Sequence, residues 1–287
     1  MRKLLRAAHA CALAVVISLT SSPFPLHAAD SDSAVLILAQ SGPGAWTKSV
    51  KKAVKEAELP YPYRLFFGMG DNADEQRELQ DMITSLEEGG AHTIYAVPLL
   101  VSSYSPVCRQ WKFLLGIDVQ PGFMNNPLFP VQKHSTIHFA DPLNDSAVVV
   151  EILLDRTHEI SSAPAKESVV IVTHGPNDNA DNDRWIEILY SISKRLKERG
   201  GYKSVEGITL RDDAPPAVRE QAVDFLRERV KAADQAGNRV LVVTLLLSAG
   251  GIEHKIGLEL RGMNYVFNTK ALLPDSRISE WIRSQVP

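Results

Sequence analysis

The sequence predicts an α/β protein made of two similar Rossmann-like three-layer domains with mostly parallel sheets, related by internal duplication. Three observations predict this fold class. Both halves contain continuous apolar runs, which are typical of buried parallel strands. Amphipathic segments with helical spacing alternate with these runs, as crossovers between parallel strands require. In addition, residues 97–103 (VPLLVSS) match residues 243–249 (VTLLLSA) without a gap, and such a repeat indicates duplication.

The N-terminus is typical of an export signal. Residues 1–6 carry three positive charges, and residues 7–19 are almost wholly apolar. A small residue at Ala28 favours cleavage there, so residues 1–28 form the expected signal peptide. The apolar run is shorter than the roughly 20 residues that a membrane-spanning helix needs. We therefore expect a periplasmic or secreted protein that has no membrane attachment after cleavage.

Composition excludes several function classes. Removal of the three signal-peptide cations would shift the formal net charge from −3 to −6, so no basic surface for nucleic acid is expected. Cys108 would then be the only cysteine, and an internal disulfide is excluded. With 45% hydrophobic residues, the chain has enough apolar surface for one large or two medium domains.

The first domain is expected at residues 29–160 and begins with a βαβ unit. Its helix carries apolar residues at helical spacing and closes on Gly89 and Gly90, a common stop signal. A Pro-, Asn- and Gly-rich stretch at 117–133 is typical of an inserted loop. The expected elements are strand 34–39, helix 74–88, strand 93–101, strand 137–143 and helix 146–160.

The second domain is expected at residues 167–287, after a linker at 161–166. The Asn- and Asp-rich stretch 177–183 lacks the glycine and glutamate of an EF-hand, so we interpret it as a loop whose Asn182 or Asp183 caps the next helix. The expected elements are strand 168–173, helices 183–198 and 216–236, strand 239–247, and a closing strand and helix within 265–286.

Two histidines lie where open α/β sheets bind ligands, after the carboxyl ends of strands. His174 follows the strand at 168–173, and His254 follows the Gly250-Gly251 turn after the strand at 239–247. Two imidazoles from neighbouring strand ends would start a divalent-metal site with open coordination positions. The alternative is a loop residue at His174 and a solvated helix face at His254. Both interpretations remain open.

These residues resemble the CbiX-type sirohydrochlorin cobaltochelatases and related class II tetrapyrrole chelatases. The family has a strand followed by His-Gly-Ser and a later strand followed by Leu-Ser-Ala-Gly-Gly-His, and the two histidines bind the metal to be inserted. Here the corresponding text is VIVTHGP at 170–176 and LSAGGIEH at 247–254. The resemblance covers both halves and implies a chelatase-like fold, a metal site at His174 and His254, and a tetrapyrrole partner.

The sequence departs from the family pattern at three places. The histidine after the glycine pair is delayed by two residues, Pro176 replaces the usual serine, and Gln40 or a neighbour stands where the first half would have its histidine. The first half is therefore expected to have a degenerate site. In the alignment of the halves Cys108 falls opposite His254, either as a soft ligand or, more in keeping with its type, as a buried structural thiol.

Metallation of a tetrapyrrole needs a base for the pyrrole protons, and two carboxylates flank His254. Glu253 is preferred slightly over Glu259; the alternative for Glu253 is a solvated carboxylate in the first turn of a helix. His134 and His138 share a face of an expected strand and form a weaker candidate metal pair.

Two functions remain open. The first is an exported lyase that inserts Co²⁺, Fe²⁺ or Ni²⁺ into a sirohydrochlorin-type tetrapyrrole with His174, His254 and Glu253 as its catalytic residues. The second is a periplasmic protein that binds metal or tetrapyrrole without turnover, which export favours. A hydrolase is disfavoured because no Gly-x-Ser-x-Gly occurs. Since duplication supplies both halves in one chain, we expect a monomer.

Overall fold

The computed structural model describes residues 32–123 and 126–287, so the expected signal peptide at residues 1–28 lies outside the described part. Strands and helices alternate along this part. Their order is β1 (Ser33–Ala39), α1 (Gly44–Glu56), β2 (Tyr63–Phe67), α2 (Ala73–Glu88), β3 (Thr93–Pro98), α3 (Pro106–Leu114), β4 (Thr136–Phe139), α4 (Ala147–His158), a 3₁₀ turn (Pro164–Lys166), β5 (Glu167–Thr173), α5 (Asn179–Gly200), β6 (Ser204–Thr209), α6 (Pro216–Gln235), β7 (Arg239–Thr244), α7 (Ile252–Glu259), β8 (Val266–Asn268) and α8 (Ser276–Ser284).

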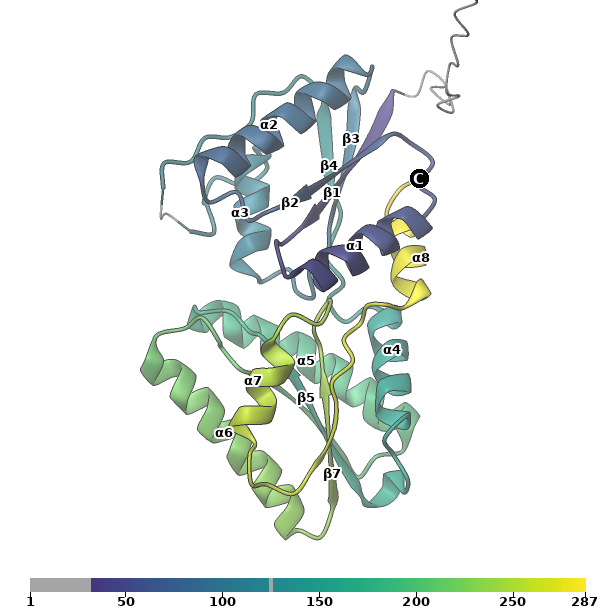
Figure 1. Cartoon of the computed structure of the whole chain (residues 1–287), viewed down its shortest axis with the longest axis vertical. Coiled ribbons are helices and arrows are strands. Elements are labelled where there is room, and N and C mark those ends of the chain that lie inside the picture. Colours follow the sequence, from purple (N-terminus) through teal and green to yellow (C-terminus); the bar gives the residue numbers. More distant parts are fainter. Residues whose placement is uncertain (1–31, 124–125) are drawn as a thin grey trace, which may run out of the picture.

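The strands form two four-stranded sheets, one in each half (Figure 1). The strand orders are β2-β1-β3-β4 and β6-β5-β7-β8, and every pairing is parallel. The two orders are the same when each half is counted from its first strand. The predicted fold class of two similar α/β domains is therefore confirmed.

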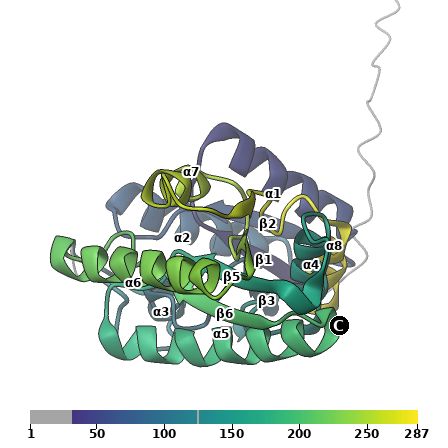
Figure 2. The same ribbon diagram turned by 90° about the horizontal axis from the view of Figure 1, so that it is seen from below.

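The central strands are buried on both faces because helices cover both sides of each sheet (Figure 2). In β5, Val169 and Ile171 face one core while Val170 and Val172 face another. The first of these cores is continuous through both halves and takes side chains from β1, α1, α4, α5, β7 and α8. Burial on both faces is why the apolar runs at β1, β5 and β7 could be recognised from sequence.

The closing helix of each half packs against the other half. Helix α4 lies against α5 and β7 of the second half, whereas α8 crosses back and lies beside α1 of the first half (Figure 1). Both helices also contact each other. The domain boundaries at residues 160 and 167 stay a prediction. In the folded chain, each half packs its closing helix against the other half.

Several element boundaries differ from the predicted ones. Helix α5 begins at Asn179, and its N-cap is Asp178, whose carboxylate accepts from the Asp181 amide; the cap is neither Asn182 nor Asp183. Strands β3 and β7 end at Pro98 and Thr244, so most of the two matching segments, residues 99–103 and 245–249, lies in loops. No helix in residues 32–123 and 126–287 is both long and apolar enough to cross a membrane.

Candidate metal centre

The carboxyl ends of both sheets face a cavity of about 400 Å³ between the two halves. This is the position at which open α/β sheets bind ligands. Polar lining residues come from the loops after β1, β3, β5, β6 and β7, and apolar side chains form most of the remaining wall. The larger apolar residues include Trp46, Met69, Leu99, Leu100, Phe123, Trp185, Leu246, Leu247 and Ile252.

His174 stands at the end of β5 and lines this cavity. Its Nδ1 lies 2.8 Å from the Gly175 carbonyl oxygen, and its Nε2 lies 3.3 Å from Asp213 Oδ2. Gly175 has φ +75°, and a Cβ there would come within 2.6 Å of the Thr209 Cβ, so only glycine fits this turn. The turn thus sets the direction of the imidazole.

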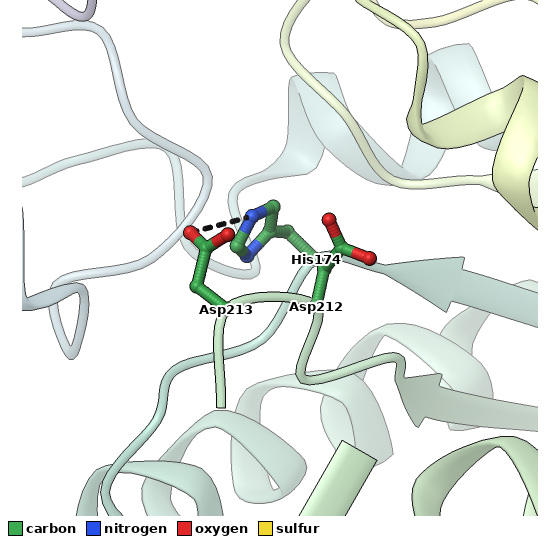
Figure 3. A group of neighbouring side chains, drawn as sticks. All are labelled: His174, Asp212 and Asp213. Atoms are coloured by element: carbon green, nitrogen blue, oxygen red, sulfur yellow. Dashed lines mark ion pairs between the residues drawn. The ribbon is translucent and has the colours of Figure 1, made fainter. Parts of the chain in front are cut away.

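Two carboxylates flank the imidazole of His174 (Figure 3). Asp212 and Asp213 come from the loop after β6, the neighbouring strand, and each of the three residues offers a ligand atom within 4.8 Å of the others. Arg211, immediately before them, has φ +52°. This left-handed residue turns the chain so that both aspartates face the end of β5.

Arg211 also fastens the loop that carries His174. Its amide donates to the His174 carbonyl at 2.6 Å. Its buried guanidinium donates to the Pro176 carbonyl at 3.1 Å, to Asn179 Oδ1 at 2.7 Å and to the Asn177 carbonyl. Because one side chain joins the loops after β5 and β6, Arg211 is a positioning residue for the whole cluster.

The charges around His174 favour its protonated form. Burial opposes a charge on the imidazole, but the hydrogen bonds to Asp213 and the Gly175 carbonyl and the negative charges of Asp213 and Asp212 outweigh it and raise the pKa of His174. The same hydrogen bond lowers the pKa of Asp213 against its own burial. The raised pKa of His174 and the lowered pKa of Asp213 both favour an imidazolium-carboxylate pair.

The two aspartates have different surroundings. The Asp213 side chain is 71% exposed, whereas that of Asp212 is only 3% exposed. Asp212 accepts hydrogen bonds from Lys255 Nζ at 2.5 Å and from Arg219 Nε at 3.3 Å. Arg219 also binds Glu259 at 2.9 Å, so the buried carboxylate belongs to a network of alternating charges.

The donor set fits a divalent transition-metal ion. Two ligand atoms that each lie about 2.1 Å from one metal are separated by about 3.0–3.4 Å at octahedral or tetrahedral angles. The 3.3 Å between His174 Nε2 and Asp213 Oδ2 is already in this range. The Nδ1–H group donates to a backbone carbonyl, which is the usual arrangement behind a metal-binding histidine and leaves Nε2 for the metal. One imidazole with carboxylate oxygens suits several first-row divalent ions.

The structure does not bring His254 into this cluster. His254 lies exposed on α7 and belongs neither to the cavity wall nor to the His-Asp-Asp group of the described residues. The physical reason is the delay of two residues after the glycine pair. It turns the histidine to another side of α7 and places Ile252 at the cavity instead. The ligand set around His174 therefore differs from the predicted pair.

Glu253 is held by the turn before α7. Its carboxylate accepts from the amides of Gly250 at 3.3 Å and Gly251 at 3.1 Å. This arrangement corresponds to the alternative interpretation of a carboxylate at a helix N-terminus. A catalytic role for Glu253 stays a prediction.

Among the described residues of the first half, no histidine lines the cavity. Gln40 lines it at the position that corresponds to His174. Cys108 is fully buried, and burial raises the pKa of its thiol to about 11, with Lys112 opposing and Asp141 adding to the rise. The interpretation of Cys108 as a buried structural thiol agrees with this position. His138 is exposed and stacks on Tyr95 at 5.5 Å, on a different face of the molecule.

Sequence reasoning missed Asp212, Asp213 and Arg211. The signal that could have found them is positional, because both aspartates follow a short strand, β6, that pairs directly with β5. Strand β6 (SVEGIT) has no continuous apolar run and was not predicted. Without that strand, nothing in the sequence indicates that the residues after Thr209 lie beside His174.

Comparisons with known proteins support the fold. No protein-family model matches the chain, and no curated protein matches it. Among solved structures, SirB from Bacillus subtilis with Fe3+ superposes with a TM-score of 0.61 at 15% identity, over 88% of this chain and 93% of that one. DR2241 from Deinococcus radiodurans, a multi-domain protein described as structurally similar to chelatases, gives a TM-score of 0.53 at 13% identity; the match covers 89% of this chain and 55% of DR2241. The chain therefore shares the fold of these two structures.

Proposed function

We propose that the protein captures a divalent metal ion at His174, Asp213 and Asp212 and delivers it to a tetrapyrrole in the cavity between the halves. The observation that carries the proposal is one imidazole between two carboxylates in a cavity with largely apolar walls. A planar macrocycle needs apolar walls, while the metal needs nitrogen and oxygen ligands on one side. The neighbours of chelatase-like fold support the same class of reaction.

The residues of the site suggest an order of events. His174 Nε2 has to lose its proton to bind the metal, and its Nδ1–H stays on the Gly175 carbonyl throughout. Asp213 exchanges the imidazolium for the metal; once the ion passes to the macrocycle, the exposed Asp213 carboxylate can accept one of the two displaced pyrrole protons, and the other goes to water. We expect Co²⁺, Fe²⁺ and Ni²⁺ to be acceptable substrates for this mixed donor set.

A binding protein without turnover is the second candidate. One observation favours it: only one imidazole faces the cavity in the described part of the chain, and Gln40 replaces the other. Incubating the protein with sirohydrochlorin and Co²⁺ separates the two functions by absorption spectroscopy. Metallation faster than the spontaneous rate supports the enzyme, and a shifted spectrum without metallation supports the binder.

A calorimetric titration with Co²⁺ tests the site itself. We expect His174→Ala to weaken binding at least about a hundredfold, roughly 2.7 kcal/mol, because it removes the only nitrogen ligand. His254→Ala is the matched control, an exposed histidine outside the cavity, and Gln40→Ala and Cys108→Ala are further controls. All three should stay within about tenfold, roughly 1.4 kcal/mol. An equal loss of Co²⁺ affinity in His254→Ala would show that the metal binds at the predicted pair, His174 and His254.

Export is part of the proposal. We expect the chain, expressed in a bacterium with a periplasm, to be recovered there with Ala29 as its first residue. Intact-mass measurement of the purified protein gives the cleavage site directly. Recovery in the cytoplasm with residues 1–28 attached would refute export.

A further inference from the structure

We propose that Lys255 is a built-in competitor of the divalent metal: its ammonium group neutralises Asp212, and metal binding requires it to move away. The inference rests on the proposed function, because it concerns the same cluster. It adds a residue that sets metal affinity without being a ligand.

The geometry places the ammonium group against a ligand oxygen. Lys255 Nζ lies 2.5 Å from Asp212 Oδ2, and Arg219 Nε lies 3.3 Å from Oδ1 of the same carboxylate. A metal bound to Asp212 would therefore lie about 4 to 5 Å from the Lys255 ammonium if the lysine stayed in place. The Asp212 side chain is 3% exposed, so little water is available to screen this repulsion. Simultaneous binding of both cations is unfavourable.

Lys255 is the cation that can leave. Its side chain is 50% exposed, and the Asp212 contact is its single ion pair within the described residues. Arg219 is 26% exposed and is held by Glu259 as well as by Asp212. A lysine stem is flexible and its ammonium is strongly hydrated, so movement into solvent costs it little. Arg219 would remain and hold the Asp212 carboxylate in position.

Displacement of Lys255 would be transmitted to the cavity wall. Lys255 lies on α7, the helix that begins after the Gly250-Gly251 turn. A Cβ at Gly250 would lie 3.6 Å from Trp46 Cδ1, so this turn is adjacent to the first half. Ile252 of the same helix lines the cavity. The Lys255–Asp212 pair therefore ties the cavity-lining helix to the metal cluster when no metal is bound.

Calorimetric titration of Co²⁺ alone into the full chain tests the inference. Lys255→Met removes the charge and keeps an unbranched stem of similar length. We expect it to raise Co²⁺ affinity at least about tenfold, because the metal no longer displaces an ion pair. The matched control is Lys270→Met, which removes another exposed lysine that pairs with a carboxylate, Glu159, at 2.8 Å. The control should stay within about twofold.

Amide hydrogen exchange of the wild-type protein provides a measurement that needs no variant. Addition of Co²⁺ should accelerate exchange in α7, because the helix loses its direct ion pair with Asp212 and keeps only the indirect link through Glu259 and Arg219. Unchanged or weaker Co²⁺ binding by Lys255→Met overturns the inference, as does unchanged exchange in α7. The proposed function fails separately: tight Co²⁺ binding by His174→Ala would place the metal elsewhere, whatever Lys255→Met does. Thermal unfolding establishes that each variant is folded.

Discussion

Replacement of Arg211 by alanine should damage the candidate site without removing any metal ligand. Its guanidinium makes three hydrogen bonds to the loop of residues 176–179 and is almost fully buried. A hydrogen bond with a charged partner contributes about 1.5–3 kcal/mol, and neighbouring bonds are not additive. We therefore expect Arg211→Ala to lower the free energy of unfolding by about 4 kcal/mol. Arg211→Lys should lose about half as much, since one ammonium cannot reach three separated acceptors.

The backbone at Arg211 adds a second, separable effect. Its φ of +52° is unfavourable for any residue with a Cβ by about 1–2 kcal/mol. Arg211→Gly loses the same hydrogen bonds but relieves this strain, so it should be more stable than Arg211→Ala by about 1 kcal/mol. The difference isolates the backbone contribution, because neither variant has a side chain that reaches the loop.

Urea unfolding, followed by both tryptophan fluorescence and circular dichroism, measures these free energies. Arg184→Ala is the control. Arg184 is an exposed arginine of α5 whose ion pair within the described residues is with Glu187 of the same helix, and its removal should change stability by less than about 0.5 kcal/mol. Co²⁺ affinity of Arg211→Lys should fall as well, since the His174 loop loses part of its anchor. The reasoning is refuted if Arg211→Ala lies within about 1 kcal/mol of wild type, or if it is more stable than Arg211→Gly.

Three further outcomes are expected. Burial opposes ionisation of Glu167, but hydrogen bonds from residues 161–163 and from Arg239 lower its pKa to about 2. The ionised carboxylate therefore contributes about 3 kcal/mol to the free energy of unfolding above pH 4.5, and this contribution is lost as the pH falls towards 2. Urea unfolding between pH 7 and 3 should show this loss, and Glu167→Gln should flatten it; equal slopes would contradict the assignment. Gly175→Ala should cost about 2–4 kcal/mol, since it combines a positive φ with a clash, whereas Gly262→Ala, with φ +81° and open space, should cost only about 1–2 kcal/mol. In protein that begins at Ala29, Cys108 should react with a disulfide reagent at pH 8 only as fast as the native state opens, and rapid labelling would show that the thiol is accessible.

Much of the fold could be predicted because its central strands are buried on both faces. The apolar runs of β1, β5 and β7 and the match between residues 97–103 and 243–249 were enough to define two α/β halves. Strands β2 and β6 were missed, and both are edge strands with mixed polar and apolar residues and partly exposed faces. Edge strands have no continuous hydrophobic signal, because only one neighbour and part of one face demand burial.

The candidate site was half predictable for a related reason. His174 could be located because it follows a well-defined strand and precedes a glycine with a required backbone conformation. Asp212 and Asp213 could not be located from the sequence. Their position depends on the edge strand β6, which was missed, and on the left-handed backbone of Arg211. His254 was placed at the metal on the basis of motif spacing, but two inserted residues change which side of α7 a side chain faces. Helix phase of this kind is fixed by packing and not by the motif.

The exchange of helices α4 and α8 has a consequence for how the chain acquires its structure during synthesis. The first half cannot cover its α1 face until α8 has been synthesised, because α8 supplies that cover. Truncation after Pro274 would therefore expose apolar surface in the half that is made first, including Val50 and Val54 of α1. Because each half takes part of its cover from the other, we expect deletion of either half to destabilise the other and the two halves to unfold together.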